Sequence, residues 1–187
     1  MNLLHRWYCS SGHWTRIVDG KLLPWVLSGV DLGENVLELG PGPGITTDVL
    51  RRRVPRLTSV EIDRSLATRL AARLAGTNAH VLHGDATRLE LPAASFSAVI
   101  ACTMLHHVAS AELQDRIFSN VRRVLRPGGV FVGSDSLSSR FFRMIHTFDT
   151  LVPVDPGGLP ARLEAAGFRE PRVDVGRGTF RFRARAA

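Results

Sequence analysis

Short apolar segments alternate with helix-like segments between residues 34 and 135, and this alternation restricts the fold more than any other feature. The apolar segments read as strands at 35–39, 57–62, 80–86, 96–102 and 130–135. Between them, apolar residues recur at the spacing of helices that bury one face. Strands that alternate with helices form parallel sheets, because a parallel neighbour needs a crossover connection. The sequence therefore predicts an α/β fold with helices on both faces of a mostly parallel sheet.

The two ends of the chain have weaker patterns. All three tryptophans lie within residues 1–30, where apolar residues at helical spacing predict short helices. Residues 160–168 predict a further helix, and 172–176 with 179–185 predict a terminal antiparallel hairpin. We expect one domain over 1–187, consisting of a helical cap at 1–30, a core at 31–135, and a connection with the hairpin at 136–187.

Composition narrows the class of protein. The chain is 44% hydrophobic and 22% charged, which is typical of a globular domain. Its net charge of +7 suits an anionic partner such as nucleic acid or a membrane surface, but the charge is scattered, which favours a general arginine bias. Cys9 and Cys102 form no disulfide framework, and no zinc spacing is present. With no apolar leader or membrane-length segment in the sequence, we expect a cytoplasmic protein.

The segment "ELGPGPG" at residues 38–44 follows the first predicted strand. Gly40, Gly42 and Gly44 let the backbone approach a ligand closely, and the intervening prolines hold the turn rigid. The following helix should begin near Gly44 or Ile45 and direct its amide groups to the same place. Because the glycine spacing does not match the dinucleotide pattern, a nicotinamide-dependent dehydrogenase is disfavoured.

Acidic residues follow the next two strands. Glu61 ends the second strand, at about the spacing from the glycine turn at which a carboxylate meets ribose hydroxyls. Asp85 follows the third strand, where its carboxylate and the amide of Ala86 are suited to the edge of an adenine. Glu38 suits an ammonium group better than a phosphate. The strand ends thus offer partners for an amino acid, a ribose and an adenine, although each carboxylate alone could also be a helix or turn cap.

Five segments in this order resemble the class I S-adenosylmethionine-dependent methyltransferases. They are "VLELGPGPG" at 36–44, "VEID" at 60–63, "HGDATRLELP" at 83–92, "FSAVIACTMLHHV" at 96–108 and "VLRPGGVFV" at 124–132. The resemblance implies a Rossmann-like seven-stranded sheet with strand order 3-2-1-4-5-7-6 and the last strand antiparallel. It also implies S-adenosylmethionine as cofactor and S-adenosylhomocysteine as product.

The resemblance assigns roles to the residues at the strand ends. Glu38 and the three glycines would border the methionine part of the cofactor, and Glu61 would hold the ribose. Ile62 would pack on the adenine, whose edge Asp85 and Ala86 would contact. Cys102, in the fourth segment, is placed with the cofactor-binding residues. By the same resemblance, residues 31–135 form the cofactor-binding core, and residues 136–187 lie on the acceptor side.

The acceptor is expected next to "ACTMLHHV" at residues 101–108. This segment lacks the Asn- or Asp-Pro-Pro-aromatic motif of enzymes that methylate base amines, and the Asn-Leu-Pro-Tyr-type segment of ribosomal-RNA adenine dimethylases. The absence of both motifs disfavours nucleic acid. The histidine pair at 106–107 resembles the small-molecule branch of this family, which implies a small, lipophilic or aromatic acceptor. His106 or His107 is a candidate general base, because a histidine titrates near neutral pH; alternatively, one packs under the next helix and the other caps it.

Two aromatic groups have alternative interpretations. One forms either a lid or the apolar face of a packing helix, and comprises Trp7, Tyr8, His13 and Trp14. The other lines either the acceptor pocket or the core, and comprises Phe141, Phe142, Met144 and Phe148. Competing functions are methylation of a phospholipid or RNA, and cofactor binding without turnover. We expect a monomer or a homodimer.

Overall fold

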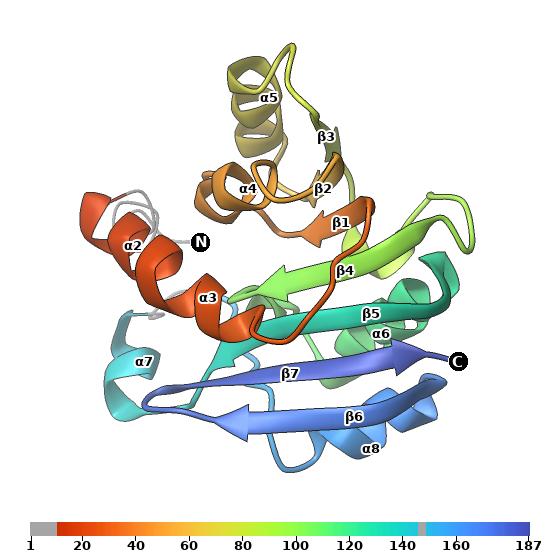
Figure 1. Cartoon of the computed structure of the whole chain (residues 1–187). Coiled ribbons are helices and arrows are strands. Elements are labelled where there is room, and N and C mark those ends of the chain that lie inside the picture. The colour runs from red at the N-terminus through yellow and green to blue at the C-terminus, as the bar shows by residue number, and fades with distance from the viewer. Residues whose placement is uncertain (1–10, 146–148) are drawn as a thin grey trace.

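Seven strands form a single sheet in the computed structural model, which describes residues 11–145 and 149–187 (Figure 1). The strands are β1 (Asn35–Leu39), β2 (Arg56–Glu61), β3 (Ala79–His83), β4 (Phe96–Cys102), β5 (Leu125–Ser136), β6 (Phe168–Val175) and β7 (Thr179–Ala186). Their order is β3-β2-β1-β4-β5-β7-β6. Neighbours from β3 to β5 pair in parallel, and β7 is antiparallel to both β5 and β6. The predicted strand order and the predicted hairpin are therefore confirmed.

Helices and helical turns precede β1 and connect the later strands. They are α2 (Gly12–Ile17), the π-helical turn η1 (Val18–Leu22), α3 (Leu23–Val26), α4 (Ile45–Leu50), α5 (Arg64–Arg73), η2 (Ala86–Arg88), η3 (Leu105–His107), α6 (Ala111–Val124), α7 (Arg140–Ile145) and α8 (Leu159–Ala165). The helices η1, α3 and α4 pack on one face of the sheet and bury Val36 and Ile100 there. On the other face, α6 and α8 bury Phe131 and Phe182. Helices therefore cover both faces of the sheet, as expected. In Figure 1, the side of β6 and β7 that faces the viewer has no helix over it.

The longest helix, α6, follows from its sequence. Ser110 caps it, because its hydroxyl accepts a hydrogen bond from the Leu113 amide at 3.2 Å. Ile117, Val121 and Val124 then recur on one face and are fully buried. The sequence pattern, in which Ser110 precedes apolar residues at helical spacing, predicts both the cap and the stripe, and the structure confirms both.

Two element boundaries differ from the sequence prediction. Residues 46–54 predict a helix that Pro55 would end, but α4 ends at Leu50. Beyond it, the Asn78 side-chain amide donates to the carbonyls of Arg51 and Val54 at 2.8 and 2.7 Å. Strand β5 begins at Leu125 rather than at Val130. Pro127 and the two glycines lie within it, in a bulge that interrupts the pairing with β4, instead of separating helix from strand.

Among the described residues, no helix is both long and apolar enough to cross a membrane.

Candidate functional site

The carboxyl ends of β1, β2 and β4 meet at one edge of the sheet, together with the end of β5 (Figure 1). Parallel strands deliver their C-terminal residues to the same edge, which is where ligands bind in open α/β sheets. The predicted glycine turn follows β1, Glu61 is the last residue of β2, and the segment around His106 follows β4. The strand order therefore brings them to one region.

The glycine turn has two kinds of glycine. Gly44 has φ +90° and precedes the first residue of α4, and a Cβ there would come within 2.3 Å of a Leu70 methyl group. Gly42 has φ +55°, but a Cβ there would meet nothing within 4 Å. Gly44 is thus required by the packing of α4 against α5. Gly42 faces open space where a ligand can approach the backbone.

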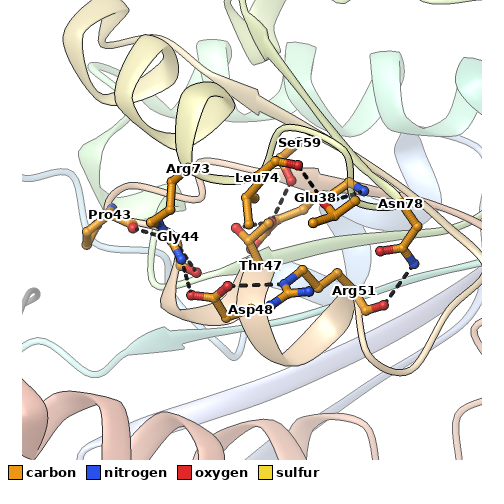
Figure 2. Close-up of polar contacts among 12 residues, drawn as sticks. Glu38, Pro43, Gly44, Thr47, Asp48, Arg51, Ser59, Arg73, Leu74 and Asn78 are labelled. Atoms are coloured by element: carbon orange, nitrogen blue, oxygen red, sulfur yellow. Dashed lines mark hydrogen bonds and ion pairs between the residues drawn. The ribbon is translucent and has the colours of Figure 1, made fainter.

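An arginine from the next helix holds the turn from outside (Figure 2). The Arg73 guanidinium donates to the carbonyls of Pro43 and Gly44 at 3.3 and 3.5 Å. It also pairs with Asp48 of α4 at 2.6 Å. The pair is partly exposed and adds little stability. Its geometry nevertheless connects the turn, α4 and α5, a contact that the sequence did not indicate.

The carboxylate of Glu38 points into the protein, towards α4 and β2 (Figure 2). It accepts hydrogen bonds from the hydroxyls of Thr47 and Ser59, both at 2.7 Å, and from Thr46. Burial raises the pKa of Glu38, and the three hydroxyls partly counteract that rise. The side chain is 2% exposed, so it supports the turn from within; direct contact with an ammonium group stays a prediction.

Glu61 lies beside the open glycine. One of its oxygens accepts the Gly42 amide hydrogen and the other accepts that of Asp63, each at 2.9 Å. A carboxylate oxygen has two lone pairs, so each retains capacity for a hydroxyl donor. The next residue, Ile62, is 66% exposed, which is unusual for a large aliphatic side chain. A charged acceptor and an exposed apolar surface thus adjoin each other at the end of β2.

Asp85 and Ala86 occupy the neighbouring strand end. The Gly84 amide donates to the Glu61 carbonyl at 3.0 Å, which holds the end of β3 against β2. The Asp85 carboxylate accepts from the Thr87 amide at 2.8 Å and so caps the turn η2. Ala86 is buried. Asp85 therefore has the capping role that was the alternative to adenine binding, and the two roles are compatible because only one lone pair is used by the cap.

Asp135 pairs with His106, and the sequence interpretation missed this pair. Asp135 is fully buried at the end of β5, and its carboxylate lies 2.5 Å from Nδ1 of His106. Its second oxygen accepts the His106 backbone amide at 3.1 Å. The His106 ring also lies 4.1 Å from that of His107 and 5.1 Å from that of Phe142, centroid to centroid. One carboxylate thus fixes both the backbone and the ring of His106.

The turn between β4 and η3 brings this pair close to the glycine turn. Thr103 has φ +51°, a left-handed conformation that is costly for a β-branched residue, and its amide donates to the Ser134 carbonyl at 2.8 Å. The next residue, Met104, packs so closely on Gly40 that a Cβ on the glycine would come within 2.9 Å of it. Cys102 precedes the turn; burial raises the pKa of its thiol to about 12, so it is a neutral packing group at physiological pH.

The remaining predicted residues are distributed differently. Trp14 of α2 is half-buried against the cluster on the α4 face, and His13 is exposed. Phe142 is buried beside His106, whereas Met144 is 62% exposed. Trp7, Tyr8, Phe148 and the side chain of Phe141 lie outside the described part of the chain. The lid and the pocket lining therefore stay predictions.

The strand order, the glycine turn after β1, Glu61 at the end of β2 and Asp85 after β3 are together those of the class I S-adenosylmethionine-dependent methyltransferases. Residues 37–133 match the model of a family described as a methyltransferase domain. Because this match covers more than half of the 187 residues, the chain belongs to that family.

Two sequence relatives and one solved structure are similar to this chain. An uncharacterized methyltransferase of Mycobacterium tuberculosis is 35% identical over 94 residues, which cover 50% of this chain and 46% of that protein. A ribosomal RNA small subunit methyltransferase A of Cupriavidus pinatubonensis is 30% identical, with 86% of this chain and 66% of that protein covered. The crystal structure of a SAM-dependent methyltransferase from Aquifex aeolicus superposes with a TM-score of 0.76 at 18% identity, covering 100% of both chains. This chain spans about half the length of the mycobacterial relative.

Proposed function

We propose that the protein transfers a methyl group from S-adenosylmethionine to a small, lipophilic or aromatic acceptor. The observation that carries the proposal is the group formed by Gly42, Glu61 and Ile62. It combines an accessible backbone, a carboxylate for a ribose diol and an exposed apolar side chain for an adenine. A sulfonium nucleoside needs these three features, and charge-assisted hydrogen bonds to the diol are strong.

The cofactor would supply an activated methyl group on a good leaving group, so positioning and exclusion of water can account for most of the acceleration. In this proposal Glu61 orients the ribose, Ile62 covers the adenine, and Asp85 with Ala86 contacts its edge. The Gly40–Gly44 turn lies against the methionine part. Its rigidity comes from Glu38 beneath it and Arg73 outside it.

We assign His106 as the candidate general base, with Asp135 as its positioning residue. A buried carboxylate at Nδ1 favours the tautomer with its proton on that nitrogen, which makes Nε2 the basic atom. As the acceptor atom bonds to the methyl carbon and the sulfur–methyl bond breaks, the acceptor's proton would pass to Nε2. His107 is half-buried next to this ring and is the second candidate.

RNA methylation is a second candidate function, which the Cupriavidus relative favours because its alignment covers 86% of this chain. The acceptor-side segment at residues 101–108 does not favour it, since no Asn-Leu-Pro-Tyr-type sequence is present there. The exposed Met144 near the buried Phe142 offers apolar surface that a lipophilic acceptor could use.

Calorimetry and a methyl-transfer screen test the two parts of the proposal. The purified protein should bind S-adenosylmethionine and S-adenosylhomocysteine; no binding of either would refute cofactor use. Labelled S-adenosylmethionine would then be incubated with cell extract separated into lipid, RNA, protein and small-molecule fractions. We expect label in the small-molecule fraction. Label confined to RNA would establish the second candidate, and binding without transfer to any fraction would indicate a non-catalytic protein.

A further inference from the structure

A groove of about 440 Å³ lies at the other end of the strands from the methyltransferase site. Its walls are the loop from Gly29 to Gly33, the β5 bulge from Arg126 to Val130, and the adjoining parts of β6 and β7. Ser97, at the amino end of β4, also lines it, whereas Cys102 ends β4 at the methyltransferase edge. Five residues of strand separate the two places by about 16 Å. The groove is therefore a distinct site.

Four arginines line the groove: Arg126, Arg172, Arg183 and Arg185. Arg183 extends from β7 towards the Gly29 loop, since its guanidinium lies 3.8 Å from the position of a Cβ on Gly29. Arg126 reaches the same loop at Gly33, at 3.3 Å by the same measure. The two guanidinium groups thus approach the same loop from different strands of the groove wall.

Few direct ion pairs compensate these charges within the described residues. Arg126 is only 4.0 Å from Glu34, at the limit of an ion pair, and no ion pair involves Arg172, Arg183 or Arg185 in the described parts of the chain. Arg183 stands directly opposite Arg172 in the β6–β7 register. Like charges opposite each other destabilise a sheet. A bound anion would remove that repulsion.

The surrounding acids restrict the size of such an anion. Asp31 and Glu170 line the same groove, and Asp174 already pairs with Arg181 at 2.8 Å farther along β7. A long polyanion would therefore leave the arginines and meet carboxylates. The groove is larger than the space that a few water molecules occupy, and its volume falls within the range of small-molecule sites. Val30 and Pro127 add apolar surface for an organic portion.

The geometry points to a binding site for a compact organic phosphate with at least two negative charges, such as a nucleoside diphosphate. One guanidinium group can donate two parallel hydrogen bonds to two phosphate oxygens, which suits a groove lined by several arginines on a sheet. The cationic sulfonium cofactor is unsuited to a groove of this charge. The site goes beyond the proposed methyl transfer and does not depend on it.

Calorimetry of the full-length protein at low ionic strength tests this site, with ADP, pyrophosphate and inorganic phosphate as probes. ADP and pyrophosphate should bind more tightly than inorganic phosphate, and their affinity should fall as salt is added. Arg183→Gln and Arg126→Gln should each weaken ADP binding about tenfold or more, as expected for a lost charged hydrogen bond. Arg69→Gln, on the exposed side of α5, is the matched control and should bind ADP like the wild type.

Two further readouts separate ligand binding from folding and from the cofactor site. Arg183→Gln should unfold at no lower temperature than the wild type without ligand, because it removes the repulsion with Arg172, but ADP should no longer raise that temperature. S-adenosylmethionine affinity should be the same in all variants. Wild-type protein that binds neither ADP nor pyrophosphate, or glutamine variants that bind them normally, would overturn the proposal. Tighter, arginine-dependent binding of oligouridylate or of anionic phospholipid vesicles would also overturn it in favour of a polymer or a membrane.

Discussion

Replacing Asp135 by asparagine tests the buried pair directly, because the change preserves the shape of the side chain and removes its charge. The carboxylate accepts three hydrogen bonds, from His106 Nδ1, the His106 amide and the Ser136 amide, and has no exposed surface. An asparagine has one oxygen and one NH₂ group. Either orientation therefore places the NH₂ against at least one of the backbone N–H donors.

The expected cost follows from that count. A buried donor left without an acceptor costs about 1–3 kcal/mol. For a domain of this size, each kcal/mol lowers the melting temperature by roughly 2–4 °C, so Asp135→Asn should unfold about 2–12 °C lower. If the NH₂ group faces the ring, it donates to Nδ1 and favours the tautomer with the ring proton on Nε2, which is then no longer a base.

Thermal unfolding and single-turnover kinetics measure the two effects. With His106 as general base, the rate of methyl transfer should fall about 10²–10⁴-fold while S-adenosylmethionine affinity stays unchanged. Asp115→Asn is the control, since that carboxylate is half-exposed and pairs with Arg162 at the surface; it should differ little from the wild type. Unaltered stability of Asp135→Asn would refute the inferred energetics of the pair. Lower stability with a normal methyl-transfer rate would make the pair purely structural.

Two further predictions concern the glycine turn. Gly44→Ala should destabilise the protein by more than about 1 kcal/mol in urea unfolding, because φ is +90° and the new Cβ would overlap Leu70. Gly42→Ala should lose less stability and should chiefly weaken cofactor binding. Equal losses of stability in the two variants would contradict the different roles assigned to the two glycines. Glu38, whose pKa is raised above 4.5, should make the wild type lose stability as pH rises from 4.5 through the raised pKa, because the folded state binds the proton more tightly in that window. Glu38→Gln should have a less negative dependence of unfolding free energy on pH there; identical slopes would show that Glu38 is not the cause.

Local patterns were sufficient to predict most of the fold. Each strand of the core is a short apolar run, and Ser110 before a stripe of apolar residues defined α6. The strand order came from the resemblance, because no local pattern specifies which strands are neighbours. The predicted start of β5 was wrong, because a proline and two glycines usually separate a helix from a strand. Here Gly128 adopts φ +73° inside a bulge that the pairing with β4 accommodates.

The candidate site was predicted less completely, because its contacts join residues distant in sequence. Asp135 lies 29 residues from His106, and they meet only because β4 and β5 are adjacent parallel strands. An acidic residue ending a buried strand was the available signal. The inward direction of Glu38 depends on hydroxyls from α4 and β2, and the orientation of Arg73 depends on how α5 packs. Such contacts follow from the assembled sheet.

A crystal structure of the protein with S-adenosylhomocysteine tests the central claim most directly. We expect the ribose hydroxyls within hydrogen-bond distance of Glu61, the adenine against Ile62, and the amino-acid portion over Gly42. A nucleoside bound away from the ends of β1 and β2, or in the arginine-lined groove, would contradict the account.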